Sequence, residues 1–253
     1  MRNTSIKTGV ILIILCIISC ASSQPQKQSE NNFPGRPVSV ETLRDAIVFK
    51  DIKTLRSEVA VRTFKDNELI GRFDGILAFM SPDALNLRIF SSKGNNLMET
   101  TMSNGIVQAY VPHTNILFEG KLPIVSLNDL PEEGHIYRFE ESEGKYILYV
   151  FKTDDGVVEL ASKYSFDKNT LLNTAIYTYM GGMQYMEMRF SDFSGKIPGK
   201  MRIVFHPSSV LEITIKNPIL NTAIPADYFK PIRHENKTVK SIRYPFSNLI
   251  SRQ

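Results

Sequence analysis

The sequence predicts a mainly β domain (α+β) built from one curled antiparallel sheet, with one N-terminal helix and a short helical break. Apolar and polar residues alternate in several short runs, which gives each strand one apolar and one polar face; these runs are 85–89, 186–190, 201–205 and 211–215. Turn residues separate such runs at intervals of roughly 10 to 15 residues, which is typical of a meander of hairpins. A sheet of that length twists strongly and is expected to curl toward a barrel.

The helix is expected from Ser39 to Asp51, where Val40, Leu43, Ile47 and Val48 lie near helical spacing and Ser39 can act as the N-cap. Everything beyond it is punctuated at strand lengths. The exception is the segment from Ile124 to Glu133, which is expected to be a short helix or a loop packed over the sheet. We expect roughly three or four strands before this break and about six after it.

The N-terminus has the pattern of an export signal. The basic residues Arg2 and Lys7 precede an apolar run at 10–18, which is about half of the roughly 20 residues that a membrane-spanning helix needs. The run ends in Ile17-Ile18-Ser19-Cys20, which resembles the bacterial lipobox. That resemblance implies a diacylglyceryl group on the Cys20 sulfur, cleavage after Ser19 and usually a further acyl chain such as palmitate. The alternatives are an ordinary secretory signal that happens to contain a cysteine, or an uncleaved anchor.

We therefore predict a lipoprotein signal peptide at 1–19 and a lipidated tether at 20–38, since the residues after Cys20 are polar and low in apolar side chains. The formal net charge of +4 includes the two signal-peptide cations, so nucleic acid is not an expected partner. The two cysteines are Cys16, in the signal, and Cys20, under lipid, so no disulfide is expected. A basic C-terminal tail is placed at 233–253, either solvated or touching anionic headgroups.

No catalytic pattern stands out. The four histidines, His113, His135, His206 and His234, lack the spacing of a metal site. The Ser142-x-x-Lys145 spacing needs a helix to bring a lysine beside a nucleophilic serine, and Gly144 favours a hairpin turn there. Neighbouring carboxylates fall in turns or strand ends, where solvated acids are common. The sequence therefore predicts neither an enzyme nor a metal or cofactor site, and a hydrolase is only a distant alternative.

Several segments together resemble the outer-membrane lipoprotein-sorting proteins, the LolA and LolB group. They are 73–79, 82–90, Lys93-Gly94, 104–112, Leu122-Pro123 and 197–205, and they span most of residues 39 to 229. The resemblance implies a half-open barrel over 39–232 that is closed by helices around an apolar cavity for acyl chains. The candidate lipid-binding residues on the apolar faces are Phe73, Leu77, Phe79, Leu85, Leu87, Ile89, Met186, Met188, Phe190, Ile203, Phe205, Leu211, Ile213 and Ile215. The alternative for each is an ordinary place in a sealed core.

One hairpin departs from the family pattern. The membrane-anchored receptor of the family presents an apolar residue at a protruding turn, whereas the matching turn here, 91–95, has Lys93. A lipid or lipopolysaccharide carrier therefore fits as well as a lipoprotein acceptor.

The predicted function is a non-enzymatic, monomeric lipoprotein on the periplasmic face of the outer membrane, which binds acyl chains and helps to transfer lipoproteins or lipids. A periplasmic carrier protein is a possible partner. Ala21 after Cys20 favours the outer membrane, because Asp at this position is associated with inner-membrane retention in enteric bacteria. The alternative from another class is a scaffolding envelope lipoprotein that binds a protein partner through its sheet.

Overall fold

The computed structural model describes residues 38–121, 130, 134–154, 156–205, 209–233 and 235–242. Within these ranges one sheet contains 14 strands. The first six are β1 (Thr54–Lys65), β2 (Glu68–Met80), β3 (Ala84–Phe90), β4 (Asn96–Ser103), β5 (Ile106–Val111) and β6 (Ile116–Lys121). The others are β7 (His135–Ser142), β8 (Lys145–Asp154), β9 (Val157–Asp167), β10 (Asn173–Met180), β11 (Met183–Ser191), β12 (Lys200–Phe205), β13 (Ser209–Leu220) and β14 (Thr238–Ser241).

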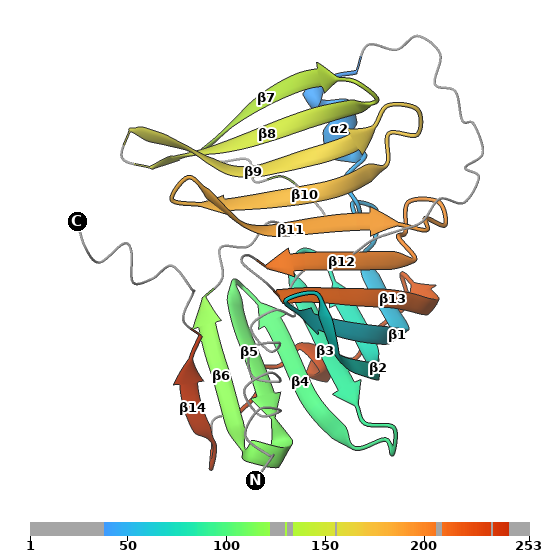
Figure 1. The fold of residues 1–253 in the computed structure, drawn as a ribbon, viewed down its shortest axis with the longest axis vertical. Helices are drawn as coiled ribbons and strands as arrows, with labels where there is room; N and C mark the ends of the chain where they lie inside the picture. Colours follow the sequence, from blue (N-terminus) through green and yellow to red (C-terminus); the bar gives the residue numbers. More distant parts are fainter. Residues whose placement is uncertain are drawn as a thin grey trace.

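The sheet is open, with the order β14-β6-β5-β4-β3-β2-β1-β13-β12-β11-β10-β9-β8-β7. Neighbouring strands are antiparallel, except for β14, which is parallel to β6. The strands of β7–β12 run across the view in Figure 1 while those of β3–β6 run nearly upright, so the sheet twists strongly along its length. The predicted fold class, a curled sheet that forms a half-open barrel, is confirmed.

The N-terminal helix is shorter than predicted. Helix α2 (Val40–Asp45) is capped by Ser39, whose hydroxyl accepts the Thr42 backbone N–H at 3.2 Å, as expected. The helix ends at Asp45 because the following N–H groups bond to carbonyls three residues back, and Phe49 takes a positive φ of 68°. The apolar positions 43, 47 and 48 are nevertheless buried. No helix in the described part of the chain is long and apolar enough to cross a membrane.

The strand count exceeds the prediction, with six strands before the break and eight after it among the described residues. Of the predicted helical break, only Leu130 is described, and it is buried. The missed strands carry weak local patterns: β14 has four residues that are all exposed, and it is a strand because it pairs with β6. Tertiary pairing, and not alternation, creates such a strand.

The predicted turns at the hairpin ends are confirmed where they are described. Asp66 and Asn67 both have positive φ, 51° and 67°, as the two-residue turn between β1 and β2 requires. Ser142 and Lys145 face each other across the β7–β8 hairpin, with Gly144 at φ 67° in the turn. The Ser-x-x-Lys spacing is therefore a hairpin here and not a helical catalytic pair.

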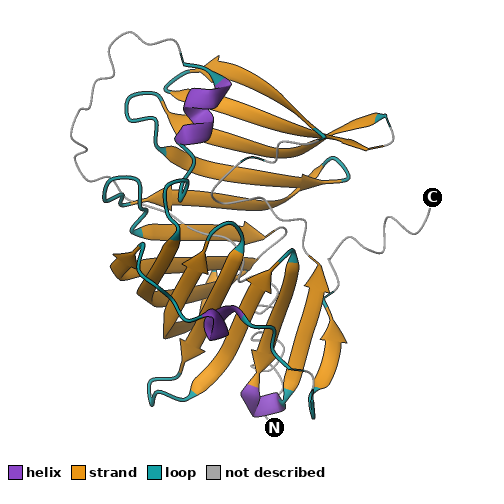
Figure 2. Cartoon of the chain, turned by 180° about the vertical axis from the view of Figure 1, so that it is seen from behind, coloured by secondary structure: helices purple, strands orange, loops and turns teal. Residues whose placement is uncertain are grey.

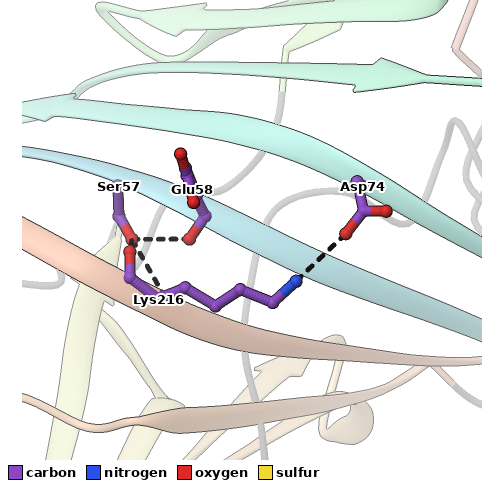
Figure 3. Close-up of polar contacts among 4 residues, drawn as sticks. All are labelled: Ser57, Glu58, Asp74 and Lys216. Carbon is purple, nitrogen blue, oxygen red and sulfur yellow. Dashed lines mark hydrogen bonds and ion pairs between the residues drawn. The ribbon is translucent and has the colours of Figure 1, made fainter. Parts of the chain in front are cut away.

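Strand β1 joins the two halves of the sheet, because it pairs with β2 on one side and with β13 on the other. The β1–β13 ladder is interrupted by a bulge, where Asn217 and Pro218 are accommodated in β13. The buried Ser57 hydroxyl fills it: Ser57 Oγ lies 2.6 Å from the Lys216 carbonyl oxygen and 2.7 Å from that of Glu58 (Figure 3). Lys216 Nζ also contacts Asp74 of β2 at 3.1 Å, which ties three strands together.

The C-terminal segment 221–232 lies against one face of β2–β6, which we call the outer face. Asn221 accepts the Lys53 N–H through its side-chain oxygen, and Gln108 of β5 both accepts from the Ile232 N–H and donates to its carbonyl oxygen. Between them the 3-10 helix η2 (Ala226–Phe229) places the Tyr228 ring under the guanidinium groups of Arg56 and Arg88.

Asn86 lies on the polar face of its strand, as the alternation predicts, and it is buried because the C-terminal segment covers this outer face. The sheet also extends past residue 232, since β14 lies within the segment predicted as a basic tail. From Thr238 to Ser241 that segment is part of the sheet and is not a free solvated tail.

We expect Gln108→Ala to loosen the C-terminal segment, because both hydrogen bonds with the Ile232 backbone are lost, at a cost of about 1–3 kcal/mol. Limited trypsin digestion should then cut faster after Arg233 and Lys237. Cleavage after Lys93, in the distant β3–β4 turn, serves as the internal control and should keep its rate. Equal acceleration at both places would indicate global destabilisation instead.

Candidate functional site

The face of the sheet opposite the C-terminal segment, the inner face, carries one continuous cluster of apolar side chains. All fourteen predicted lipid-binding residues lie in it: twelve are buried, and Phe73 and Phe205 are partly buried at its margin. The structure therefore brings the predicted set together. Their role in binding lipid is a separate matter and remains a prediction.

Strand register explains why these residues meet. Directly opposite residues in an antiparallel pair share a face, and Leu77 lies opposite Leu87 between β2 and β3. On the other half of the sheet, Met188, Ile203 and Leu211 form a row across β11, β12 and β13. The joint at β1–β13 places the two rows on the same face.

Helix α2 and the residues after it lie over the inner face, and α2 is seen in front of the sheet in Figure 2. The Phe49 ring contacts the Phe79 ring with a centroid separation of 5.9 Å. Lys196, in the β11–β12 connection, binds the Asp51 carboxylate at 2.5 Å and so holds the far end of this segment. Helix α2 and the residues after it thus cover the apolar face, and the Lys196–Asp51 ion pair fixes the end of this segment near the edge of the sheet.

The sequence analysis left a further part of the cluster unnamed. These buried members come from β1, β4, β5, β6, β8, β9 and β10, and they include Leu55, Val59, Val61, Met98, Met102, Val107, Phe118, Leu148, Val150, Phe166 and Ile176. A readable signal existed in β1, where Leu55, Val59 and Val61 alternate with charged or small residues. In strand β8 the residues from 146 to 151 are all aromatic or aliphatic, so its inner positions cannot be assigned from the pattern.

Methionine is concentrated on this face. Five of the nine methionines, Met98, Met102, Met186, Met188 and Met201, are buried in the cluster. Their unbranched thioether side chains change shape at little energetic cost, so they suit a surface that repacks around different apolar groups. The same property also lets methionine fill an irregular core.

A few hydroxyls lie among these apolar groups. Thr178 donates to the Met186 carbonyl oxygen, and burial holds the pKa of the nearby Tyr185 hydroxyl above its ordinary value. Thr100 is fully buried between Leu87 and Ala109 on the neighbouring strands. Its hydroxyl has no hydrogen-bond partner among the described residues. An unsatisfied hydroxyl in an apolar setting is costly, and it is a ready donor for a buried carbonyl oxygen.

The remaining predicted features fall as follows. Cys20, the predicted lipidation site, lies outside the described residues. No group of three or more His, Cys, Asp or Glu side chains arranged for a metal ion occurs in the described ranges. The 91–95 turn is tight, because the Ser91 hydroxyl accepts the backbone N–H groups of Lys93 and Asn95, and its tip is exposed and polar as the sequence indicates.

The arrangement of strands in this sheet is similar to that of known proteins whose structures have been solved. A LolA superfamily protein from Nitrosomonas europaea superposes with a TM-score of 0.55 at 12% identity, over 77% of this chain and 99% of that one. The chain has the LolA fold. A putative outer membrane lipoprotein-sorting protein domain from Vibrio parahaemolyticus is also similar, with a TM-score of 0.48 at 12% identity over 70% of this chain and 88% of that one. No family model and no curated protein sequence matches.

In this LolA-fold chain, Thr100→Val tests the unsatisfied hydroxyl. Since valine has nearly the same shape and no polar group, we expect the free energy of unfolding to stay the same or rise by about 1 kcal/mol. Urea denaturation measures it. Thr63→Val is the matched control, because the Thr63 hydroxyl does have a partner, the Gly71 carbonyl oxygen, and its loss should destabilise. A clear loss of stability in Thr100→Val would mean that its hydroxyl is satisfied.

Proposed function

We propose that the chain is a lipid-anchored protein of the bacterial envelope that holds acyl chains of lipoproteins or lipids against its inner face and takes part in their transfer to the outer membrane. The observation that carries this proposal is the continuous apolar cluster on the inner face, rich in methionine, beneath the segment that begins with α2. In this role the protein binds and does not catalyse.

The energetics favour such a role. Apolar burial is worth roughly 25 cal/mol per Å², so an acyl chain that replaces part of the cover on this face gains free energy without any directional contact. Polar contacts of the cover include Lys196 with Asp51 and Arg44 with the Leu130 carbonyl oxygen. Breaking the exposed Lys196–Asp51 pair costs little, because exposed ion pairs contribute about 0–1 kcal/mol. Thr100 would supply a hydrogen bond to an ester carbonyl oxygen.

The anchor in this proposal is the lipid on Cys20, and the location is the periplasmic face of the outer membrane. Two or three acyl chains, at about 0.8 kcal/mol for each buried methylene, hold a protein on a bilayer almost permanently. A protein held in this way receives its cargo from a periplasmic carrier and passes it to the membrane beside it. The fold shared with the LolA superfamily protein from Nitrosomonas europaea agrees with this role but does not establish it.

The inner face is tested by photo-crosslinking in a two-membrane bacterium grown with radiolabelled palmitate. Phe205 is replaced by p-benzoylphenylalanine, an aromatic residue at a partly buried margin of the cluster, so the fold should be kept. Illumination should attach labelled acyl groups to the proteolytic fragment that carries position 205, which is separated from the N-terminal fragment that Cys20 labels without light. Tyr110 on the outer face, whose ring lies 5.0 Å from Lys237 Nζ, receives the same residue as the control. Equal labelling at both positions would contradict binding on the inner face.

The proposed lipid anchor on Cys20 is tested with two cysteine variants, one as the test and one as its control. Cys20→Ala should abolish palmitate labelling and the mass of the diacylglyceryl group, because only a thiol at that place accepts the lipid. Cys16→Ala, four residues upstream in the apolar run, should leave both unchanged. Intact-protein mass spectrometry and membrane fractionation report the result. A normal lipid mass in the Cys20→Ala variant would overturn the lipobox assignment.

A second candidate function, a scaffold for a protein partner, is favoured by the edge strand β7. Its eight residues end the sheet, and Ile136, Arg138 and Glu140 point away from the core and are exposed. Backbone groups at such an edge pair readily with a strand of another chain. If the photo-crosslinker at Phe205 captures no acyl group while one at Ile136 captures a protein, the scaffold replaces the carrier.

A further inference from the structure

A row of charged side chains crosses the middle of the sheet on its outer face. Arg62 of β1 lies opposite Arg72 on one side and Glu212 on the other. Arg202 of β12 lies opposite both Glu212 and Arg189. We call these five residues the arginine row; in spatial order they are Arg72, Arg62, Glu212, Arg202 and Arg189, from β2, β1, β13, β12 and β11. In each strand a residue next to them in the chain packs in the inner apolar cluster, so the row faces the other way.

The arginine row is open to solvent. Arg62, Arg72 and Arg189 are exposed, and Arg202 and Glu212 are half-buried. The C-terminal segment that covers part of the outer face therefore leaves the row accessible. Neighbouring strands are about 4.8 Å apart, so the row extends over roughly 19 Å.

The row brings like charges together twice. Arg62 lies directly opposite Arg72, and Arg189 lies directly opposite Arg202. Like charges at directly opposite positions in neighbouring strands destabilise a sheet, because their side chains are only about 5 Å apart. The fold gains no stability from these two pairs, whereas an anion bound between two guanidinium groups would replace their repulsion by attraction.

The central carboxylate does not satisfy the arginines beside it. Its oxygens lie 3.8 Å from Arg62 Nη1 and 3.9 Å from Arg202 Nε, which is beyond the roughly 3.2 Å of a hydrogen bond. Arg202 Nε is buried and has no hydrogen-bond partner among the described residues. Glu212 is thus shared between two arginines and leaves donors of both without a close acceptor.

The ends of the row differ in their partners. Arg189 is paired with Glu187, whereas Arg72 forms no ion pair in the part of the chain that the structure describes. The four arginines of the row therefore face two carboxylates, those of Glu187 and Glu212, and the row keeps an excess of positive charge.

The residues that flank the row do not cancel this excess. On one side Lys200 is paired with Asp192, so the two add no net charge. On the other side Phe64, Val210 and Val204 lie opposite one another in β1, β13 and β12, and all three are partly buried. The row is therefore a positive strip with an apolar border.

Phosphate is the anion that this geometry suits. A guanidinium group presents its donors in a planar fork that matches two oxygens of a phosphate group. Each arginine pair offers two such forks side by side, and a phosphate group has enough oxygens to accept from both. The centres of the two pairs are three strand spacings apart, roughly 14 Å, so each pair has room for a phosphate group of its own.

We infer that the arginine row binds phosphate groups, one over the Arg62–Arg72 pair and one over the Arg189–Arg202 pair. The phosphate belongs either to the headgroup of a lipid or to a soluble compound; the recognition chemistry is the same, and the experiment separates the two sources. The inference requires neither the lipid anchor nor acyl binding by the inner face.

The test is the urea unfolding midpoint of the full chain in a neutral detergent, with pyrophosphate or with chloride at the same ionic strength. A ligand that binds only the folded chain raises this midpoint. We expect pyrophosphate to raise it for the unchanged protein but not for Arg72→Gln/Arg202→Gln, which keeps one arginine of each pair. In chloride this variant should be at least as stable as the unchanged protein, because the like charges no longer face each other.

Arg138→Gln/Lys152→Gln is the matched control, since it removes two exposed cations from β7 and β8, away from the row. Its response to pyrophosphate should equal that of the unchanged protein. An equal rise in all three proteins is the general effect of such salts on folding and overturns the inference. If the double variant of the row does not fold, Arg72→Gln alone, which removes no ion pair among the described residues, is read in the same way.

Glu212→Gln tests the row in the opposite direction. Loss of the carboxylate between the two arginine pairs should lower the pyrophosphate concentration that gives half of the rise, by up to about fivefold, as for an exposed charge pair. A higher concentration in a folded Glu212→Gln variant would contradict the inference.

Mixed micelles separate the two sources of phosphate. A rise with phosphatidylglycerol in the micelles but not with pyrophosphate assigns the row to lipid headgroups, and a rise with pyrophosphate alone assigns it to a soluble phosphate compound. Phosphatidylcholine, whose headgroup has no net charge, is the control lipid. No rise with either ligand overturns the inference.

Discussion

The pairing of β1 with β13 is the constraint on which the rest of the structure depends. It brings together residues such as Ser57 and Lys216, which are 159 positions apart in the chain. Closing so long a loop costs conformational entropy, which only extensive pairing and burial can offset. Both strands are 12 residues long, and β1 is hydrogen-bonded on each side. Without this joint, β2–β6 and β7–β13 would be two separate stacks of hairpins, each with half of the inner face.

The two faces of the joined sheet differ in which side chains they carry and in which segments cover them. The inner face collects apolar residues from both halves under the segment that starts with α2, and it is the surface proposed to hold acyl chains. The outer face is divided. Residues 221–232 cover part of β2–β6 through contacts such as Ile232 with Gln108 and Tyr228 with Arg88, and β14 extends the sheet beyond β6.

Several features of the fold could be predicted from local sequence patterns. The alternation through Leu85, Leu87 and Ile89 predicts an inner face in β3 because side chains in a strand repeat every two residues, and the structure buries all three. Ser39 predicts the helix start because its hydroxyl can accept a free N–H of the first turn, as it does. The burial of Asn86 has no such local signal, since a strand pattern does not reveal that a distant segment will cover its polar face.

The sequence by itself determined the class of fold, most hairpin turns, the start of the helix and the fourteen inner-face candidates, because each follows from interactions between residues close in the chain. It also supplied the lipobox at Cys20, which lies outside the described residues. Only the tertiary structure decided the order of the strands, the place of β14 in the sheet and the division of the outer face. These depend on contacts such as Gln108 with Ile232, 124 positions apart, and such contacts leave no periodic trace in the sequence.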